Sequence, residues 1–136
     1  MKKCKKQCPI CPFVKEEKVI KRNNCTWKIN SEITCQTQNL VYMIKCTKEG
    51  CKENIYIGES ERSMKERIQE HIQYIKSENK SQATGYHFNQ PGHSLHNMVV
   101  TGIEKTKSSE KEYRKERESY IIRKFNSFYM GMNRMP

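Results

Sequence analysis

The seven cysteines of this chain constrain its fold most, because they can supply a reinforcement that its apolar residues cannot. Only 35% of the 136 residues are hydrophobic and the mean hydropathy is -0.96, so the core must be thin. A thin core usually needs a metal, disulfides or a partner. The number of cysteines is odd, and no apolar segment follows the basic start of the chain as in a signal peptide. We therefore expect an intracellular, reducing environment, where clustered cysteines more often bind metal; a secreted disulfide protein is the alternative.

The chain is also strongly basic. It has 26 Lys and Arg residues against 15 acids, which gives a formal net charge of +11. A charge of this sign on a small domain favours a polyanionic partner, most commonly nucleic acid. The longest apolar run, Leu40 to Ile44, is too short to cross a bilayer, so we expect no membrane partner.

The residue patterns change near position 38. Residues 1–38 form a leader rich in Cys and Lys with poor periodicity, and residues 39–136 carry clearer signals. Two β-rich segments, Leu40–Ile44 and Asn54–Gly58, flank a turn-like stretch and predict an antiparallel hairpin. Met98–Val100 predicts a third strand.

Two helices are expected in the second part of the chain. Ser63 and Glu66 form a capping box, and an apolar stripe at helical spacing follows it: Met64, Ile68, Ile72 and Ile75. The second helix should run from about Glu110 to Phe125, with these buried candidates: Tyr113, Tyr120, Ile121 and Phe125. The fold class we predict is α+β, a small three-stranded antiparallel sheet flanked by helices.

Four polar side chains are expected around one cleft. Arg67 and His71 are four residues apart, so they project from adjacent turns of one helix face, beside the apolar stripe. Tyr42 and Tyr56 lie on the neighbouring strands and can share one sheet face. Arginine can stabilise the negative charge of a phosphate in the transition state, and tyrosine and histidine can transfer protons or orient a water molecule. Together they indicate phosphoryl chemistry, although each alone is more often packing or surface.

The same residues, taken in order, resemble the core motif of the GIY-YIG nuclease family: Leu40-Val41-Tyr42, Tyr56-Ile57-Gly58, Arg67 and His71. The second signature is intact, whereas the first keeps only its tyrosine. The family's metal-binding glutamate, followed by an aliphatic and a basic pair, is matched by Glu118, and its later asparagine by Asn133. The resemblance covers residues 40–134.

This resemblance implies a metal-dependent endonuclease that nicks DNA by hydrolysing a phosphodiester bond. Tyr42, aided by His71, would take a proton from the attacking water. Mg²⁺ or Mn²⁺ at Glu118 would stabilise the leaving oxygen, and Arg67 the pentavalent phosphate. Which tyrosine is the base stays open. The alternative is a catalytically inactive, zinc-stabilised nucleic-acid-binding module, which the degenerate first motif leaves open and the complete set of site residues opposes.

Two short pairs of residues predict a zinc site. The pairs are Cys46-x4-Cys51 and His87-x5-His93, and two thiolates with two imidazoles suit tetrahedral zinc. His96 is a rival for the fourth position. This insertion and the segment from His87 to Ser94 also resemble the GIY-YIG domains of Penelope-like retroelements, which implies one structural zinc here. It further implies a retrotransposon origin, a nuclear location and a reverse transcriptase in cis or in trans.

The leader repeats the cysteine pattern. Cys8-x2-Cys11 is a half-site for zinc, and Cys25 and Cys35 could complete a second site. The alternative is a set of free thiols in a flexible tail. The lysines of the leader could bind the phosphate backbone of a nucleic acid.

Overall fold

The computed structural model describes residues 1–22, 24–127 and 131–133 of the chain. Its elements, in chain order, are η1 (Cys11–Phe13), β1 (Val19–Arg22), β2 (Cys25–Lys28), β3 (Leu40–Cys46), β4 (Ile55–Ser60), α1 (Met64–Lys76), α2 (Ala83–His87), η2 (Leu95–Asn97), β5 (Met98–Lys105) and α3 (Lys111–Phe125). No helix in these described segments is long and apolar enough to span a membrane.

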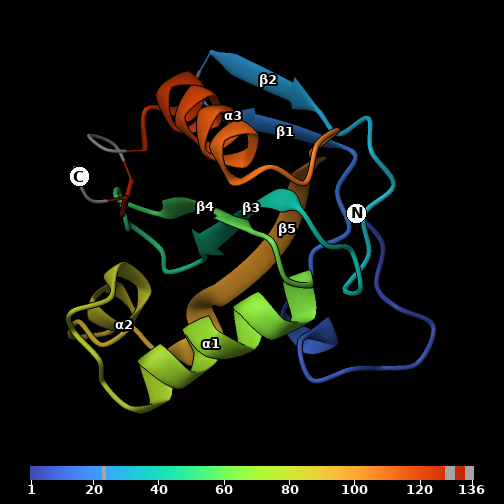
Figure 1. The fold of residues 1–136 in the computed structure, drawn as a ribbon. Coiled ribbons are helices and arrows are strands. Elements are labelled where there is room, and N and C mark those ends of the chain that lie inside the picture. Colours follow the sequence, from blue (N-terminus) through green and yellow to red (C-terminus); the bar gives the residue numbers. More distant parts are fainter. Residues whose placement is uncertain (23, 128–130, 134–136) are drawn as a thin grey trace.

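The centre of the molecule is an antiparallel sheet with the strand order β4-β3-β5. Helix α1 covers one face and α3 the other, as Figure 1 shows with α3 above and α1 below the sheet. Consecutive residues of β3 point to opposite faces. Tyr42 therefore packs with Ile68 of α1, whereas Met43 packs with Ile121 of α3. The predicted α+β architecture, three antiparallel strands flanked by helices, is confirmed.

Helix α1 begins where the capping box predicts. Ser63 is the N-cap residue, and its hydroxyl oxygen accepts a hydrogen bond from the Glu66 backbone N–H at 3.2 Å. The face that carries Met64, Ile68 and Ile75 is buried against the sheet. The apolar stripe thus places Arg67 and His71 beside the sheet.

Helix α3 follows the prediction at both ends but not in its buried face. Ile121 and Phe125 are buried as expected, and Tyr113 is half-buried. Tyr120 is 41% exposed, so its assignment to the core is wrong. Its ring lies beside Trp27, with a centroid distance of 6.2 Å, on the flank of the helix. Arg114 is buried on the inward face of α3 together with the apolar residues. Because Arg114 is charged, the apolar pattern of the sequence does not reveal this face.

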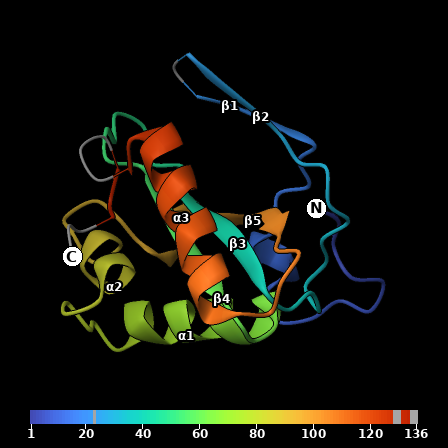
Figure 2. The same cartoon turned by 45° about the horizontal axis from the view of Figure 1, so that its top comes forward.

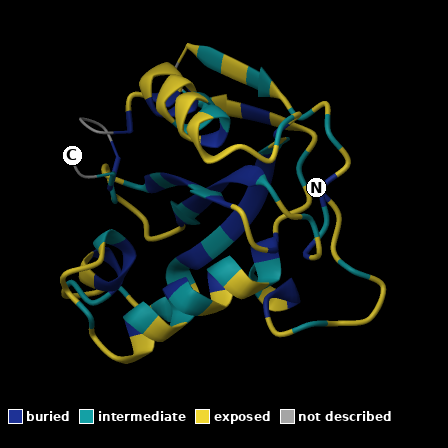
Figure 3. Cartoon of the chain, viewed as in Figure 1, coloured by how far each residue is buried: buried dark blue, intermediate teal, exposed yellow. Residues whose placement is uncertain are grey.

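The leader is folded onto the domain, and it contains a hairpin that the sequence pattern did not predict. Strands β1 and β2 pair antiparallel beside α3 (Figures 1 and 2). Ile20 of β1 is buried in the cluster on the α3 side, whereas Ile10 and Val14 are buried on the α1 side. Val14 also bridges to Val100 of β5. Buried residues therefore run from the leader into both cores (Figure 3).

Candidate active site and metal centres

Strands β3 and β4 bring Tyr42 and Tyr56 onto the sheet face that α1 covers. Tyr42 pairs with Gly58, and Tyr56 pairs with Ile44, so the two tyrosines are diagonal neighbours with ring centroids 6.4 Å apart. A Cβ at Gly58 would lie 2.4 Å from the hydroxyl oxygen of Tyr42. The glycine of the Tyr-Ile-Gly signature therefore leaves the space in which the Tyr42 hydroxyl lies.

Helix α1 contributes the two other residues of the predicted cleft. His71 Nε2 is 2.7 Å from the Tyr42 hydroxyl, and Arg67 donates to the same hydroxyl through Nε at 3.1 Å. Arg67 also donates to Glu70 at 2.7 Å. The ring of His71 meets the rings of both Tyr42 and Tyr56 edge-on. The structure thus brings together Tyr42, Tyr56, Arg67 and His71.

A fifth residue, Thr84 of α2, belongs to this cluster and was missed in the sequence. Its hydroxyl lies 2.7 Å from Nδ1 of His71 and is fully buried. Burial, followed by the charge of Arg67, lowers the pKa of His71 to about 3. The imidazole is therefore neutral, with one nitrogen that donates and one that accepts. Tyr42, His71 and Thr84 form one chain of hydrogen bonds. A five-residue helix gives no periodic signal by which Thr84 could have been found.

The two tyrosines differ in exposure. Tyr42 is fully buried, and this burial, followed by the neighbouring Tyr56, raises the pKa of Tyr42 well above its ordinary value. Tyr56 is half-buried, and desolvation also raises the pKa of its hydroxyl. Both are protonated at neutral pH. Tyr56 and Arg67 are partly buried, so they are more accessible to a ligand than the buried Tyr42 and His71.

Glu118 approaches the cluster from the other helix. Because β4 is an edge strand, α3 can project a side chain past it toward the tyrosines. Burial raises the pKa of Glu118, whereas the charge of Lys115 acts against this rise. The Glu118 carboxylate in turn raises the pKa of Tyr56 by its charge. None of the ion pairs in the described segments involves Glu118, so this carboxylate is suited to a hard cation such as Mg²⁺.

Asn133 lies against the edge of β4 and holds the backbone there. Its amide donates to the Ile57 carbonyl at 2.8 Å and accepts from the Ile57 N–H at 2.7 Å. The Ser127 hydroxyl donates to the same amide oxygen at 2.7 Å. Ile57 stands between Tyr56 and Gly58, so Asn133 fixes the strand that carries the signature.

The predicted set of two cysteines and two histidines comes together in space. The ligand atoms of Cys46, Cys51, His87 and His93 all lie within 4.8 Å of one another. Nε2 of His93 is buried and has no hydrogen-bond partner in the described part of the protein. Burial and then His93 lower the pKa of His87 to about 4, which keeps it in the neutral form that binds metal. His96, the rival for the fourth position, is exposed in η2 and lies outside the cluster.

The cysteines of the leader gather differently from the predicted set. Cys8, Cys11 and Cys35 cluster as expected, but Cys4 is the fourth member. Cys25 lies on β2, half-buried against the core on the α3 side. Its predicted place in a second zinc set is corrected, because the unforeseen hairpin carries it to the other face of the sheet.

These residues agree with what a comparison of protein families finds. The model of the GIY-YIG catalytic domain matches residues 38–133, a span that holds every residue of the candidate active site. The chain therefore belongs to the GIY-YIG family, a family of nuclease domains. The chain has no match among curated proteins or solved structures.

Proposed function

We propose that this protein is a metal-dependent DNA endonuclease that nicks one strand by hydrolysing a phosphodiester bond. The observation that carries this proposal is the contact of one buried tyrosine hydroxyl, that of Tyr42, with both His71 and Arg67. A proton acceptor and a phosphate-binding cation thus meet at one oxygen atom. Within a GIY-YIG domain, this arrangement suits in-line attack of water on phosphorus.

The proton path follows the hydrogen bonds. In the tautomer with hydrogen on Nδ1, His71 donates to Thr84 and accepts the Tyr42 hydroxyl proton at Nε2. As that proton moves to His71, Tyr42 takes one from the attacking water. The hydroxide oxygen bonds to phosphorus, and the leaving oxygen departs with its electron pair. The negative charge of a bound phosphate would favour the protonated form of His71 and so assist this transfer.

The phosphate itself would bind at the partly buried Tyr56 and Arg67. Arg67 lines an open cleft together with two glutamates and with the cations Arg62 and Lys111. These cations supply the sequence-independent attraction to a phosphate backbone. Because Tyr42 is fully buried in the free protein, the attacking water enters together with the substrate.

Glu118 would hold Mg²⁺ or Mn²⁺, which stabilises negative charge on the leaving oxygen when bound. A single half-buried carboxylate fits Mg²⁺, because this ion often takes one or two protein carboxylates and keeps waters for its other positions. Tyr56 would contact the phosphate from β4, and Glu118 would hold the metal from α3.

The cluster of Cys46, Cys51, His87 and His93 would bind one structural zinc. It joins the end of β3 to the end of α2, the helix that carries Thr84. His93→Ala should lower the zinc content of purified protein by one ion per chain, and His96→Ala should leave it unchanged. Equal zinc content in the wild type and His93→Ala would contradict this assignment.

We further propose a Penelope-like retrotransposon origin, supported by the cysteine pair between the two signatures and the later histidine pair. The protein would then act in the nucleus, with a reverse transcriptase in cis or in trans. Expression with a fluorescent tag tests the location, and a cytoplasmic signal alone would count against it.

Plasmid nicking tests the main proposal. Wild-type protein should convert supercoiled plasmid into open circles only with Mg²⁺ or Mn²⁺, and Tyr42→Phe and Tyr56→Phe should each lose this activity. Folded, zinc-loaded protein that binds DNA in a salt-dependent way without nicking would instead establish the inactive nucleic-acid-binding module.

A further inference from the structure

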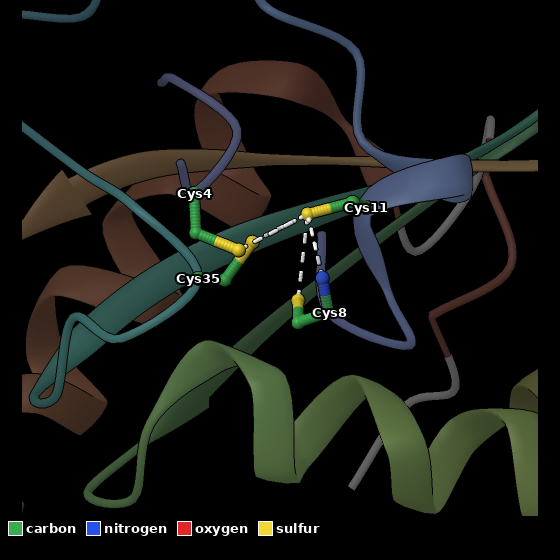
Figure 4. Close-up of side chains that lie close together, drawn as sticks. All are labelled: Cys4, Cys8, Cys11 and Cys35. Atoms are coloured by element: carbon green, nitrogen blue, oxygen red, sulfur yellow. Dashed lines mark hydrogen bonds between the residues drawn. The ribbon is translucent and has the colours of Figure 1, made fainter. Parts of the chain in front are cut away.

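Four thiols from two distant parts of the chain meet next to the start of α1. Cys4 and Cys8 precede η1, Cys11 is its first residue, and Cys35 comes from the loop that precedes β3 (Figure 4). Cys11 is the centre of the group: its sulfur lies 3.2 Å from that of Cys4, 3.5 Å from that of Cys8 and 3.9 Å from that of Cys35.

These distances fit a shared metal ion better than disulfides. Four thiolates around zinc, each bonded at about 2.3 Å, place their sulfur atoms about 3.8 Å apart. A disulfide needs about 2.05 Å and joins only two sulfurs, whereas Cys11 is close to three. All seven cysteines are free. The Cys8 backbone N–H also points to the Cys11 sulfur at 3.4 Å, a type of contact that supports a metal-bound thiolate.

We propose that Cys4, Cys8, Cys11 and Cys35 bind one structural zinc ion that ties the leader to the catalytic domain. Cys11 and Cys35 are buried, and Cys4 and Cys8 are half-buried. Buried thiolates need a compensating positive charge, which a divalent ion provides. The other Cys/His cluster lies elsewhere, with Cys46 at the far end of β3, so this is a separate site.

The site is connected to the helix of the catalytic residues. The carbonyl of Cys35 accepts a hydrogen bond from the Lys65 N–H at 2.8 Å, and that of Thr37 accepts one from the Met64 N–H at 2.9 Å. These are the first two residues of α1, which carries Arg67 and His71. Zinc here would therefore fix the entry of α1, and the leader with Ile10 and Val14 would fold together with the nuclease domain.

Zinc content of the full chain tests the proposal without any activity measurement. Cys4→Ser should contain one zinc ion fewer per chain than the wild type. Cys25→Ser, the same chemical change on β2, should contain as many as the wild type. Zinc content unchanged by Cys4→Ser, or lowered by Cys25→Ser, would overturn the assignment.

Cobalt substitution keeps the test decisive if Cys4→Ser fails to fold. Folded Cys51→Ser keeps all four leader thiols, so its cobalt form should show the thiolate charge-transfer and visible bands of a four-sulfur site. Wild-type protein with cobalt in both clusters has six cobalt–thiolate bonds: four at the four-cysteine site and two at the Cys/His site. The four-cysteine site should therefore supply about two thirds of the charge-transfer intensity. Folded Cys51→Ser without the four-sulfur spectrum would refute the proposal.

Discussion

Gly58 and Tyr42 pair across β4 and β3, and a Cβ on Gly58 would lie 2.4 Å from both Cζ and the hydroxyl oxygen of Tyr42. No ordinary side chain tolerates such a distance. The last letter of the Tyr-Ile-Gly signature is therefore explained by packing: the hydroxyl that binds His71 and Arg67 occupies the space above that glycine.

Gly58→Ala should displace the Tyr42 ring and reduce nicking about a hundredfold, since a shift near 1 Å can cost that much. Overpacking should also lower the free energy of unfolding by about 1–3 kcal/mol. Gly102→Ala is the matched control, because Gly102 flanks Tyr42 from β5 but a Cβ there would meet the side chain of Ile33. It should lose stability while its folded fraction keeps nicking. Wild-type nicking by folded Gly58→Ala would contradict the packing role.

Thr84→Val should weaken catalysis without touching the substrate, because Thr84 acts as a positioning residue for His71. The change keeps the shape and removes the partner of Nδ1, at a cost of about 1–3 kcal/mol in the free energy of unfolding. We expect a lower kcat with little change in KM, and rescue by Thr84→Ser. Nitrogen chemical shifts of the imidazole should show a mixture of tautomers in Thr84→Val and one tautomer in Thr84→Ser. A single unchanged tautomer in Thr84→Val would refute this role.

The low pKa of His71 makes stability depend on pH in a defined window. Burial, then Arg67, lowers this pKa to about 3, whereas the unfolded chain has a value of about 6.5. As the pH falls below about 6.5, His71 becomes protonated in the unfolded state but stays neutral in the native state. The free energy of unfolding therefore decreases down to about pH 3. Between pH 7 and 5 the slope should be steeper for the wild type than for His71→Asn, as measured by urea unfolding with excess zinc. Equal slopes would mean that His71 titrates normally.

Arg114 should matter more for stability than any exposed arginine. Its side chain is only 3% exposed, and it donates from Nε to Glu59 at 2.9 Å and from Nη1 to the Asn39 amide oxygen at 3.1 Å. Arg114→Met leaves Glu59 without its main partner and should cost about 3–5 kcal/mol. Arg117→Met breaks the pair with Glu104, whose side chains are 30% and 22% exposed, and should cost about 1 kcal/mol or less. Urea unfolding measures both, and similar losses would contradict the difference.

Periodicity predicted the parts of the site that lie on regular elements. Tyr42 and Tyr56 follow the alternation of two strands, and Arg67 and His71 follow the spacing of one amphipathic helix, so local rules suffice to gather them. The resemblance to GIY-YIG domains added Glu118 and Asn133, which no local rule links to the strands.

The remaining features depend on contacts between distant segments, which spacing does not encode. The hairpin of β1 and β2 is short and is stabilised by packing such as that of Trp27 against Phe125 of α3. Because this hairpin carries Cys25 away, Cys4 takes its place beside the other three predicted cysteines, Cys8, Cys11 and Cys35. Tyr120 was misplaced for a similar reason: a buried Arg114, rather than an apolar residue, continues the inner face of α3.

We propose that Glu118 binds the metal of a metal-dependent nuclease, and one comparison of variants tests this proposal most directly. Supercoiled plasmid nicking should be measured over a range of Mg²⁺ concentrations for the wild type, Glu118→Gln and Glu116→Gln. Glu116 lies two residues away on the exposed face of α3 and serves as the matched control. We predict that Glu118→Gln is folded and inactive at every Mg²⁺ concentration, while Glu116→Gln nicks as the wild type does. Metal-dependent nicking that survives in Glu118→Gln would contradict this assignment.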